Sequence, residues 1–140
     1  MFKNITENLA VGSITDVETL TEIQEKGYKT LIDLCPLAEG NKLDEATMKN
    51  LGFDYVSIPV SMQTLNQQTL NSFITAVKES SQPIYTRCAS GLRASVFTLI
   101  TLAMQEHWTE EKYQREFNTL GLQHKPNCPL ADFAHTCLTE

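Results

Sequence analysis

The side chains best suited to chemistry lie in residues 84–95, which read IYTRCASGLRAS. An apolar strand pattern ends there at the thiol of Cys88, and a helical pattern begins near Arg93. Backbone N–H groups of the loop and of the first helical turn have no partner within the helix, and the helix dipole adds positive potential. Such a place binds anions. The expected anion-binding residues are Ala89, Ser90, Gly91 and Leu92.

Cys88 and Arg93 are the expected catalytic residues. A thiolate is itself an anion in this field, so Cys88 is expected to be a nucleophile at neutral pH. Gly91 permits the turn that directs successive N–H groups inward. The planar guanidinium of Arg93 suits a tetrahedral oxyanion. The alternative is a small buried Cys88 and a surface Arg93, but strand, thiol, glycine, arginine and helix occur in the order that an anion site requires.

Strand and helix patterns alternate along the whole chain and position this segment. Strand patterns occupy residues 9–11, 30–34, 55–58 and 84–86, and helical patterns occupy residues 15–27, 44–51, 66–79, 93–106, 109–120 and 130–138. This alternation predicts an α/β fold with a central, mostly parallel sheet of four or five strands. The ligand crevice of such folds lies beyond the carboxyl ends of the strands.

The first helix has the sequence marks of both a start and a stop. Thr15 and Glu18 fit a capping box, and Gly27 fits a helix end. Val17, Leu20 and Ile23 share one helical face and are expected to be buried.

Length and charge narrow the possible partners. The 140 residues predict one domain, residues 1–140, that folds without a disulfide or metal. A net charge of −6, from 17 acidic and 11 basic residues, argues against a nucleic-acid or anionic-membrane partner. No export signal precedes the first strand pattern, and the run 94–104 is too short to cross a bilayer, so a cytoplasmic location with reduced thiols is expected.

The segment around Cys88 resembles the signature of the cysteine-dependent protein phosphatases. Residues 8–13 (NLAVGS) resemble the opening strand of dual-specificity phosphatases, and residues 53–60 (FDYVSIPV) resemble the strand before their acid loop. From Phe2 to Thr119, the chain is most similar to the phosphatase-like domain of bacterial β-lactamase-hydrolase-like proteins. The resemblance implies a three-layer phosphatase fold, with Cys88 as nucleophile and Arg93 as ligand of a small anionic or phosphorylated substrate. No cofactor or metal is expected.

The chain departs from the phosphatase pattern at several positions. Four residues rather than five separate the cysteine and the arginine, a spacing similar to the smaller loop of rhodanese-type sulfurtransferases. Arg87 replaces the usual histidine, and Ala94 replaces the usual hydroxyl residue, a role that Ser95 would have to take. Residues 61–63 (SMQ) lack the aspartate that serves as general acid. The leading hypothesis is phosphate-ester hydrolysis through a phosphocysteine at Cys88. The alternatives are sulfur transfer through a Cys88 persulfide and a non-catalytic anion- or phosphopeptide-binding module.

Two residues that follow another strand pattern are expected on the same sheet edge. Cys35 is either a small strand-end residue or a thiol that traps an oxidised Cys88 as a disulfide, which requires Cα atoms within about 7 Å. Glu39 is either a proton donor, as an acidic residue is common here in the related bacterial domains, or a solvated loop carboxylate. Asp33 and Asp54 lie within strand patterns and are not expected to act as displaced acids.

Four residues near the C-terminus include the side chains that zinc prefers. They are His124, Cys128, His135 and Cys137. Their spacing does not form the paired ligands of structural zinc sites, and the last two would point in different directions on a helix. A metal site is therefore not expected.

Overall fold

The central element of the fold is one five-stranded sheet. The computed structural model describes residues 1–124 and 128–139. The strands follow the order β1-β2-β5-β3-β4; β2, β5, β3 and β4 are parallel, and β1 is antiparallel to β2. Their bounds are β1 (Phe2–Thr6), β2 (Leu9–Gly12), β3 (Thr30–Asp33), β4 (Asp54–Ser57) and β5 (Ile84–Arg87). The expected mostly parallel α/β sheet is confirmed.

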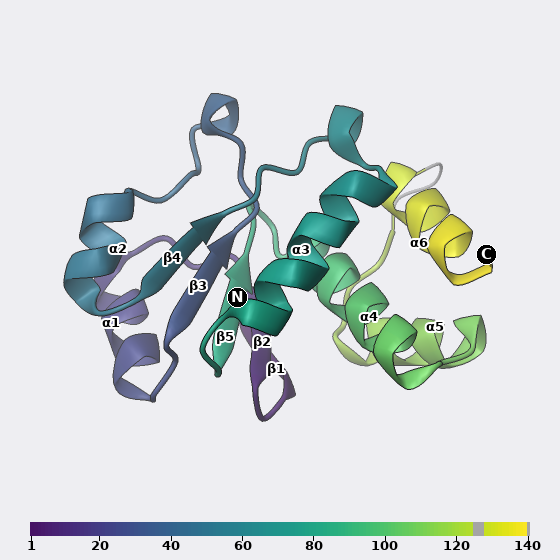
Figure 1. Cartoon of the computed structure of the whole chain (residues 1–140), viewed down its shortest axis with the longest axis horizontal. Helices are drawn as coiled ribbons and strands as arrows, with labels where there is room; N and C mark the ends of the chain where they lie inside the picture. Colours follow the sequence, from purple (N-terminus) through teal and green to yellow (C-terminus); the bar gives the residue numbers. More distant parts are fainter. Residues whose placement is uncertain (125–127, 140) are drawn as a thin grey trace.

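Helices cover both faces of the sheet and complete three layers (Figure 1). One face carries α1 (Val17–Glu25) and α2 (Glu45–Leu51). The other carries α3 (Gln67–Glu79), α4 (Leu92–Glu106), α5 (Glu110–Thr119) and α6 (Pro129–Thr139). Each side has its own hydrophobic cluster, one around Leu20 and Met48 and the other around Phe73 and Phe97. None of the described helices is both long and apolar enough to span a membrane.

Helix α4 is the buried helix that begins at the candidate site. Every residue from Arg93 to Ala103 is buried, because the helix packs on β2 and β5 and is covered by α5 and α6. A helix that is apolar on all sides belongs in a core, so its position is fixed by packing around its whole circumference. The first turn of α4 is therefore held rigidly against the end of β5.

Two features differ from the sequence-based prediction at the N-terminal end. Strand β1 was not predicted; its five residues are only partly buried or exposed, as expected at a sheet edge. The prediction of a capping box by Thr15 and Glu18 was wrong: Asp16 caps α1 by accepting the N–H of Thr19 at 2.8 Å. This start turns Val17 outward, so that 49% of it is exposed, whereas the rest of the predicted face is buried.

The sheet register brings three loops to one edge. Gly12 and Asp33 both lie opposite Arg87, at the carboxyl ends of β2, β3 and β5. One residue further on, Cys88 donates its N–H to the carbonyl of Gly12 at 3.1 Å, and Leu34 donates to the carbonyl of Arg87 at 2.9 Å. The loop after β5 thus lies between the loops after β2 and β3.

Candidate active site

Cys88 follows β5 directly, and its sulfur faces the start of α4. Its Sγ accepts the backbone N–H of Gly91 at 3.1 Å and that of Ala94 at 3.4 Å. The positive φ of Gly91 (88°) turns the loop into α4, and a Cβ there would lie 2.5 Å from the Sδ of Met1. Amide dipoles therefore converge on the sulfur, as the sequence predicted. Cys88 is fully buried beneath the exposed residues Ala89 and Ser90.

The hydroxyl groups near this loop stabilise its shape. Ser95 donates to the carbonyl of Gly91 at 2.7 Å, so in this structure it bonds the loop backbone and does not take the phosphatase hydroxyl role against the sulfur. Ser90 accepts the N–H of Leu92 at 3.3 Å. Both contacts hold the segment between the strand and the helix.

Arg93, in the first turn of α4, is paired on its outer side. Its Nη1 and Nη2 donate to the two carboxylate oxygens of Glu39 at 2.9 and 2.8 Å, and Nη1 also donates to the carbonyl of Val60 at 2.6 Å. Burial alone would lower the pKa of Arg93, but the hydrogen bonds to Glu39 and the proximity of Cys88 more than offset it, so the pKa is raised. The guanidinium retains its Nε–H and one Nη2 hydrogen, which have no acceptor in the described part of the chain.

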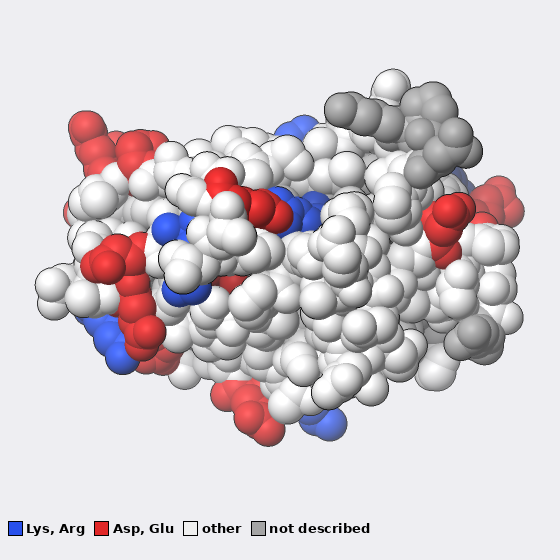
Figure 2. Space-filling model, turned by 90° about the horizontal axis from the view of Figure 1, so that it is seen from above, with Lys and Arg blue, Asp and Glu red and all other residues white. Residues whose placement is uncertain are grey.

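Glu39 was expected to be a solvated carboxylate or a proton donor. It lies instead at the end of the short helix η1 (Leu37–Glu39) and forms a bidentate pair with Arg93. Its side chain is 34% exposed, whereas that of Arg93 is 10% exposed. Figure 2 shows acidic and basic side chains in contact near the middle of this face. Glu39 therefore orients the arginine.

Arg87, in the place of the usual histidine, is fully buried and does not contact the sulfur. Its Nη1 donates to Asp33 at 2.9 Å and to the carbonyl of Asn41 at 2.7 Å. Asp33 also accepts the hydroxyl of Tyr55 at 2.7 Å and the N–H of Leu43 at 2.8 Å. Burial, and then the contact with Asp33, raise the pKa of Tyr55. Arg87 and Asp33 thus fasten the loops beneath the site, and Asp33 is not a displaced acid.

The acid loop offers no carboxylate. Ser61 begins the short helix η2 (Met62–Thr64), and its hydroxyl accepts the N–H of Gln63 at 3.2 Å. The carbonyl of Val60, one residue earlier, faces Arg93. The loop therefore contributes to the position of the arginine through its backbone.

Cys35 lies two residues beyond β3 and is fully buried. Burial raises the pKa of this thiol to about 11, and nearby charges, Cys88 among them, also act on it. Cys35 is therefore a protonated thiol at neutral pH. Whether it pairs with an oxidised Cys88 stays a prediction.

The histidines near the C-terminus have protein partners of their own. His135 Nδ1 lies 2.8 Å from each carboxylate oxygen of Glu110, and the ring of His124 stacks on Phe117 at 4.4 Å between centroids. Burial lowers the pKa of His124. Within residues 1–124 and 128–139, no three His, Cys, Asp or Glu side chains form a group that could hold a metal ion.

Sequence reasoning missed the groups that position the arginine. The carbonyls of Asn41 and Val60 left no signal, because any residue supplies a carbonyl. The role of Glu39 had one usable signal, its place after a strand on the same sheet edge as Arg93.

A family model described as "Beta-lactamase hydrolase-like protein, phosphatase-like domain" matches residues 1–105. The chain is 25% identical over 126 residues to a β-lactamase hydrolase-like protein of Xylella fastidiosa, covering 86% of this chain and 28% of that protein. It is 26% identical over 95 residues to one of Agrobacterium fabrum, covering 64% and 22%. The chain thus spans about a quarter of the length of the curated relatives it matches.

Solved structures of low sequence identity share the fold. TpbA of P. aeruginosa, in complex with phosphotyrosine, has a TM-score of 0.79 at 12% identity, covering 95% of this chain and 82% of that chain. PTPMT1, in complex with PI(5)P, has a TM-score of 0.74 at 14% identity, covering 99% and 97%. The three-layer phosphatase-like fold is confirmed.

Proposed function

The chain belongs to the phosphatase-like domain family of the β-lactamase hydrolase-like proteins, and from this membership we propose that it hydrolyses phosphate esters through a phosphocysteine at Cys88. The observation that carries the proposal is the pair of amide N–H groups, from Gly91 and Ala94, that converge on the sulfur. Arg93 lies in the same helical turn and keeps two donors for an anion. The loop N–H groups of residues 89–92 complete the phosphate site.

The reaction has two steps. In the first, Cys88 Sγ attacks phosphorus, an S–P bond forms, and the P–O bond to the alcohol or phenol breaks. The leaving oxygen takes a proton from water, because residues 61–63 carry no carboxylate. In the second, water attacks phosphorus, the S–P bond breaks, and inorganic phosphate leaves. Loop amides and Arg93 stabilise the charge on the phosphoryl oxygens in both steps.

A small anionic or phosphorylated substrate is part of this proposal. Phosphotyrosine in TpbA and PI(5)P in PTPMT1 are phosphorylated ligands of proteins with this fold, which supports it. The net charge of −6 disfavours nucleic acid. The proposal includes a cytoplasmic location, where Cys88 would stay reduced.

Sulfur transfer is the second candidate, favoured by the four-residue spacing between Cys88 and Arg93. A shorter loop suits a single sulfur atom better than a phosphate. Here Cys88 Sγ would attack the outer sulfur of thiosulfate, forming an S–S bond and releasing sulfite. Cyanide would then remove the outer sulfur as thiocyanate and restore the thiolate.

A side-by-side assay separates these functions. Wild type and Cys88→Ser are given p-nitrophenyl phosphate in one series, and thiosulfate with cyanide in the other. Hydrolysis predicts p-nitrophenolate release by wild type alone and no thiocyanate above background. Thiocyanate formation, with one added sulfur on Cys88, would replace the phosphatase proposal by sulfur transfer. Inertness in both series, with Cys88 alkylated at the rate of an ordinary thiol, would leave an anion-binding module.

A further inference from the structure

The loop after β3 connects the candidate active site to a neighbouring pocket. Its first part holds Arg93 through Glu39, and its middle is fastened by the bond from Arg87 to the carbonyl of Asn41. Its last part is fastened at Leu43, whose N–H donates to Asp33 at 2.8 Å. A loop held at three successive points is preorganised, so a pocket wall built from it costs little to order when a ligand binds.

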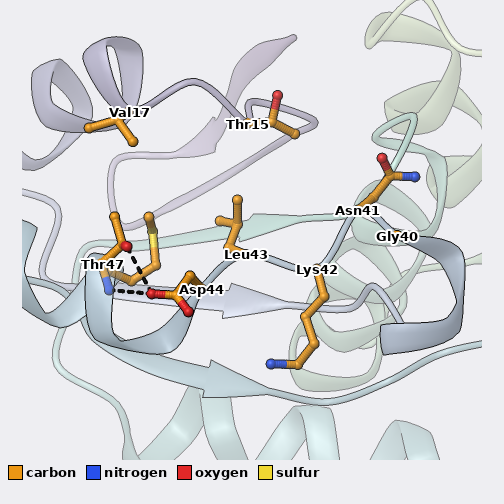
Figure 3. A pocket seen from close by; sticks show the side chains of 9 residues that line it. Thr15, Val17, Gly40, Asn41, Lys42, Leu43, Asp44 and Thr47 are labelled. Carbon is orange, nitrogen blue, oxygen red and sulfur yellow. Dashed lines mark hydrogen bonds between the residues drawn. The ribbon is translucent and has the colours of Figure 1, made fainter.

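The pocket lies between this loop and the segment that follows β2. Its volume is about 430 Å³, within the range of small-molecule sites. It is lined by Thr15, Val17, Gly40, Asn41, Lys42, Leu43, Asp44, Thr47 and Met48. Figure 3 shows Thr15 and Val17 on one side and the segment from Gly40 to Thr47 on the other.

The sheet order places this pocket beside Cys88. Its two walls follow β2 and β3, which are the two neighbours of β5 in the sheet. The loop that begins at Cys88 lies between them at the same sheet edge. A ligand anchored by an anionic group against that loop would therefore have the pocket next to it.

The lining combines a cation with apolar contacts. Lys42 forms no ion pair in the described part of the chain; its Nζ lies 5.1 Å from the ring centroid of Tyr55. The carboxylate of Asp44 accepts the N–H and the hydroxyl of Thr47 at 2.9 and 2.8 Å (Figure 3), so its charge is directed at the N-terminus of α2. Val17, apolar and half exposed, offers contact area that the protein core does not use.

We propose that this pocket binds the organic part of the substrate, and that Lys42 selects phosphate monoesters with a second anionic group. The enclosed volume suits a small molecule, whose apolar body contacts Val17 and Leu43 and whose second anion is neutralised by the Lys42 ammonium. The assignment rests on the proposed function in one respect, that the phosphate group lies in the loop after Cys88.

The test measures binding, so that it does not depend on turnover. Titration calorimetry compares phenyl phosphate with 3- and 4-carboxyphenyl phosphate on Cys88→Ser. We expect at least one carboxylated compound to bind about fivefold more tightly, the gain typical of a partly exposed charge pair. Adding Lys42→Gln should remove this preference and leave the affinity for phenyl phosphate unchanged. Adding Lys49→Gln is the matched control, since this lysine lies on α2 outside the pocket lining and pairs with Glu45.

The outcomes separate the pocket from the reaction. A preference that survives Lys42→Gln, or no preference at all, overturns the assignment. The same loss of preference in the Lys49→Gln variant also overturns it, because the effect would then be one of net charge. The predicted binding pattern together with no turnover by wild type refutes hydrolysis and leaves the pocket assignment standing.

Discussion

Replacing Glu39 by glutamine tests whether this residue positions Arg93 or donates a proton. The carboxylate accepts two charge-assisted hydrogen bonds from the guanidinium, at 2.8 and 2.9 Å, and glutamine keeps only one acceptor. A hydrogen bond to a charged group contributes about 1.5–3 kcal/mol, and partial exposure of Glu39 places the loss at the lower end. We therefore expect kcat/KM to fall about tenfold, which corresponds to about 1.4 kcal/mol.

The assay uses a series of aryl phosphates whose leaving phenols differ in pKa. A positioning role predicts the same loss for every member, because Arg93 binds the phosphate and not the leaving oxygen. A proton donor would instead give a loss that grows with the pKa of the phenol and vanishes for the most acidic one. That pattern, or tighter binding of phosphate by Glu39→Gln, would refute the positioning role. Glu45→Gln, on the exposed side of α2, is the control and should match wild type.

Three further predictions follow from the same contacts. Gly91→Ala should cost about 1–2 kcal/mol of stability because φ is 88° and should also weaken phosphate binding, whereas Gly40→Ala, with φ 78° and no atom within 4 Å of its Cβ, should lose stability alone; equal phosphate affinities in urea-unfolded and titrated samples of the two would contradict this. Arg93→Lys should lose most activity at a nearly unchanged Tm, and Arg87→Lys should do the reverse, because only Arg87 is paired with the buried Asp33; equal, small effects on activity would contradict the assignment. An unfolded chain releases the Cys35 proton near pH 9, but the folded chain retains it to about pH 11, so stability should fall through this window more steeply in wild type than in Cys35→Ala, and parallel urea-unfolding curves would count against it.

The positions of most elements were predictable from local pattern. Gly52 ends α2 in the left-handed conformation, and Asp44 caps its start, because both tasks depend on neighbouring residues only. The choice of cap for α1 was not predictable in this way, since Thr15 and Asp16 both have suitable side chains and the exit of the chain from β2 decides between them. Strand β1 has no buried face of its own, so its alternation is too weak to detect.

The parts of the site that local pattern predicted are those contained in one segment. Cys88, Gly91 and Arg93 are close in sequence, so their convergence follows from a single strand-to-helix turn. The partners of the two arginines are 54 residues distant along the chain, in each case on the neighbouring strand or its loop. Sheet register brings such pairs together, and one sequence does not specify that register.

The central claim is that Cys88 itself carries the phosphoryl group, and trapping that group tests it most directly. Wild type mixed with p-nitrophenyl phosphate and quenched in acid within milliseconds is digested and examined by mass spectrometry. The account predicts one added phosphoryl group on the peptide that contains Cys88, formed at the rate of the p-nitrophenolate burst and absent in Cys88→Ser. Undiminished turnover by Cys88→Ser, or a phosphoryl group on any other residue, would contradict it.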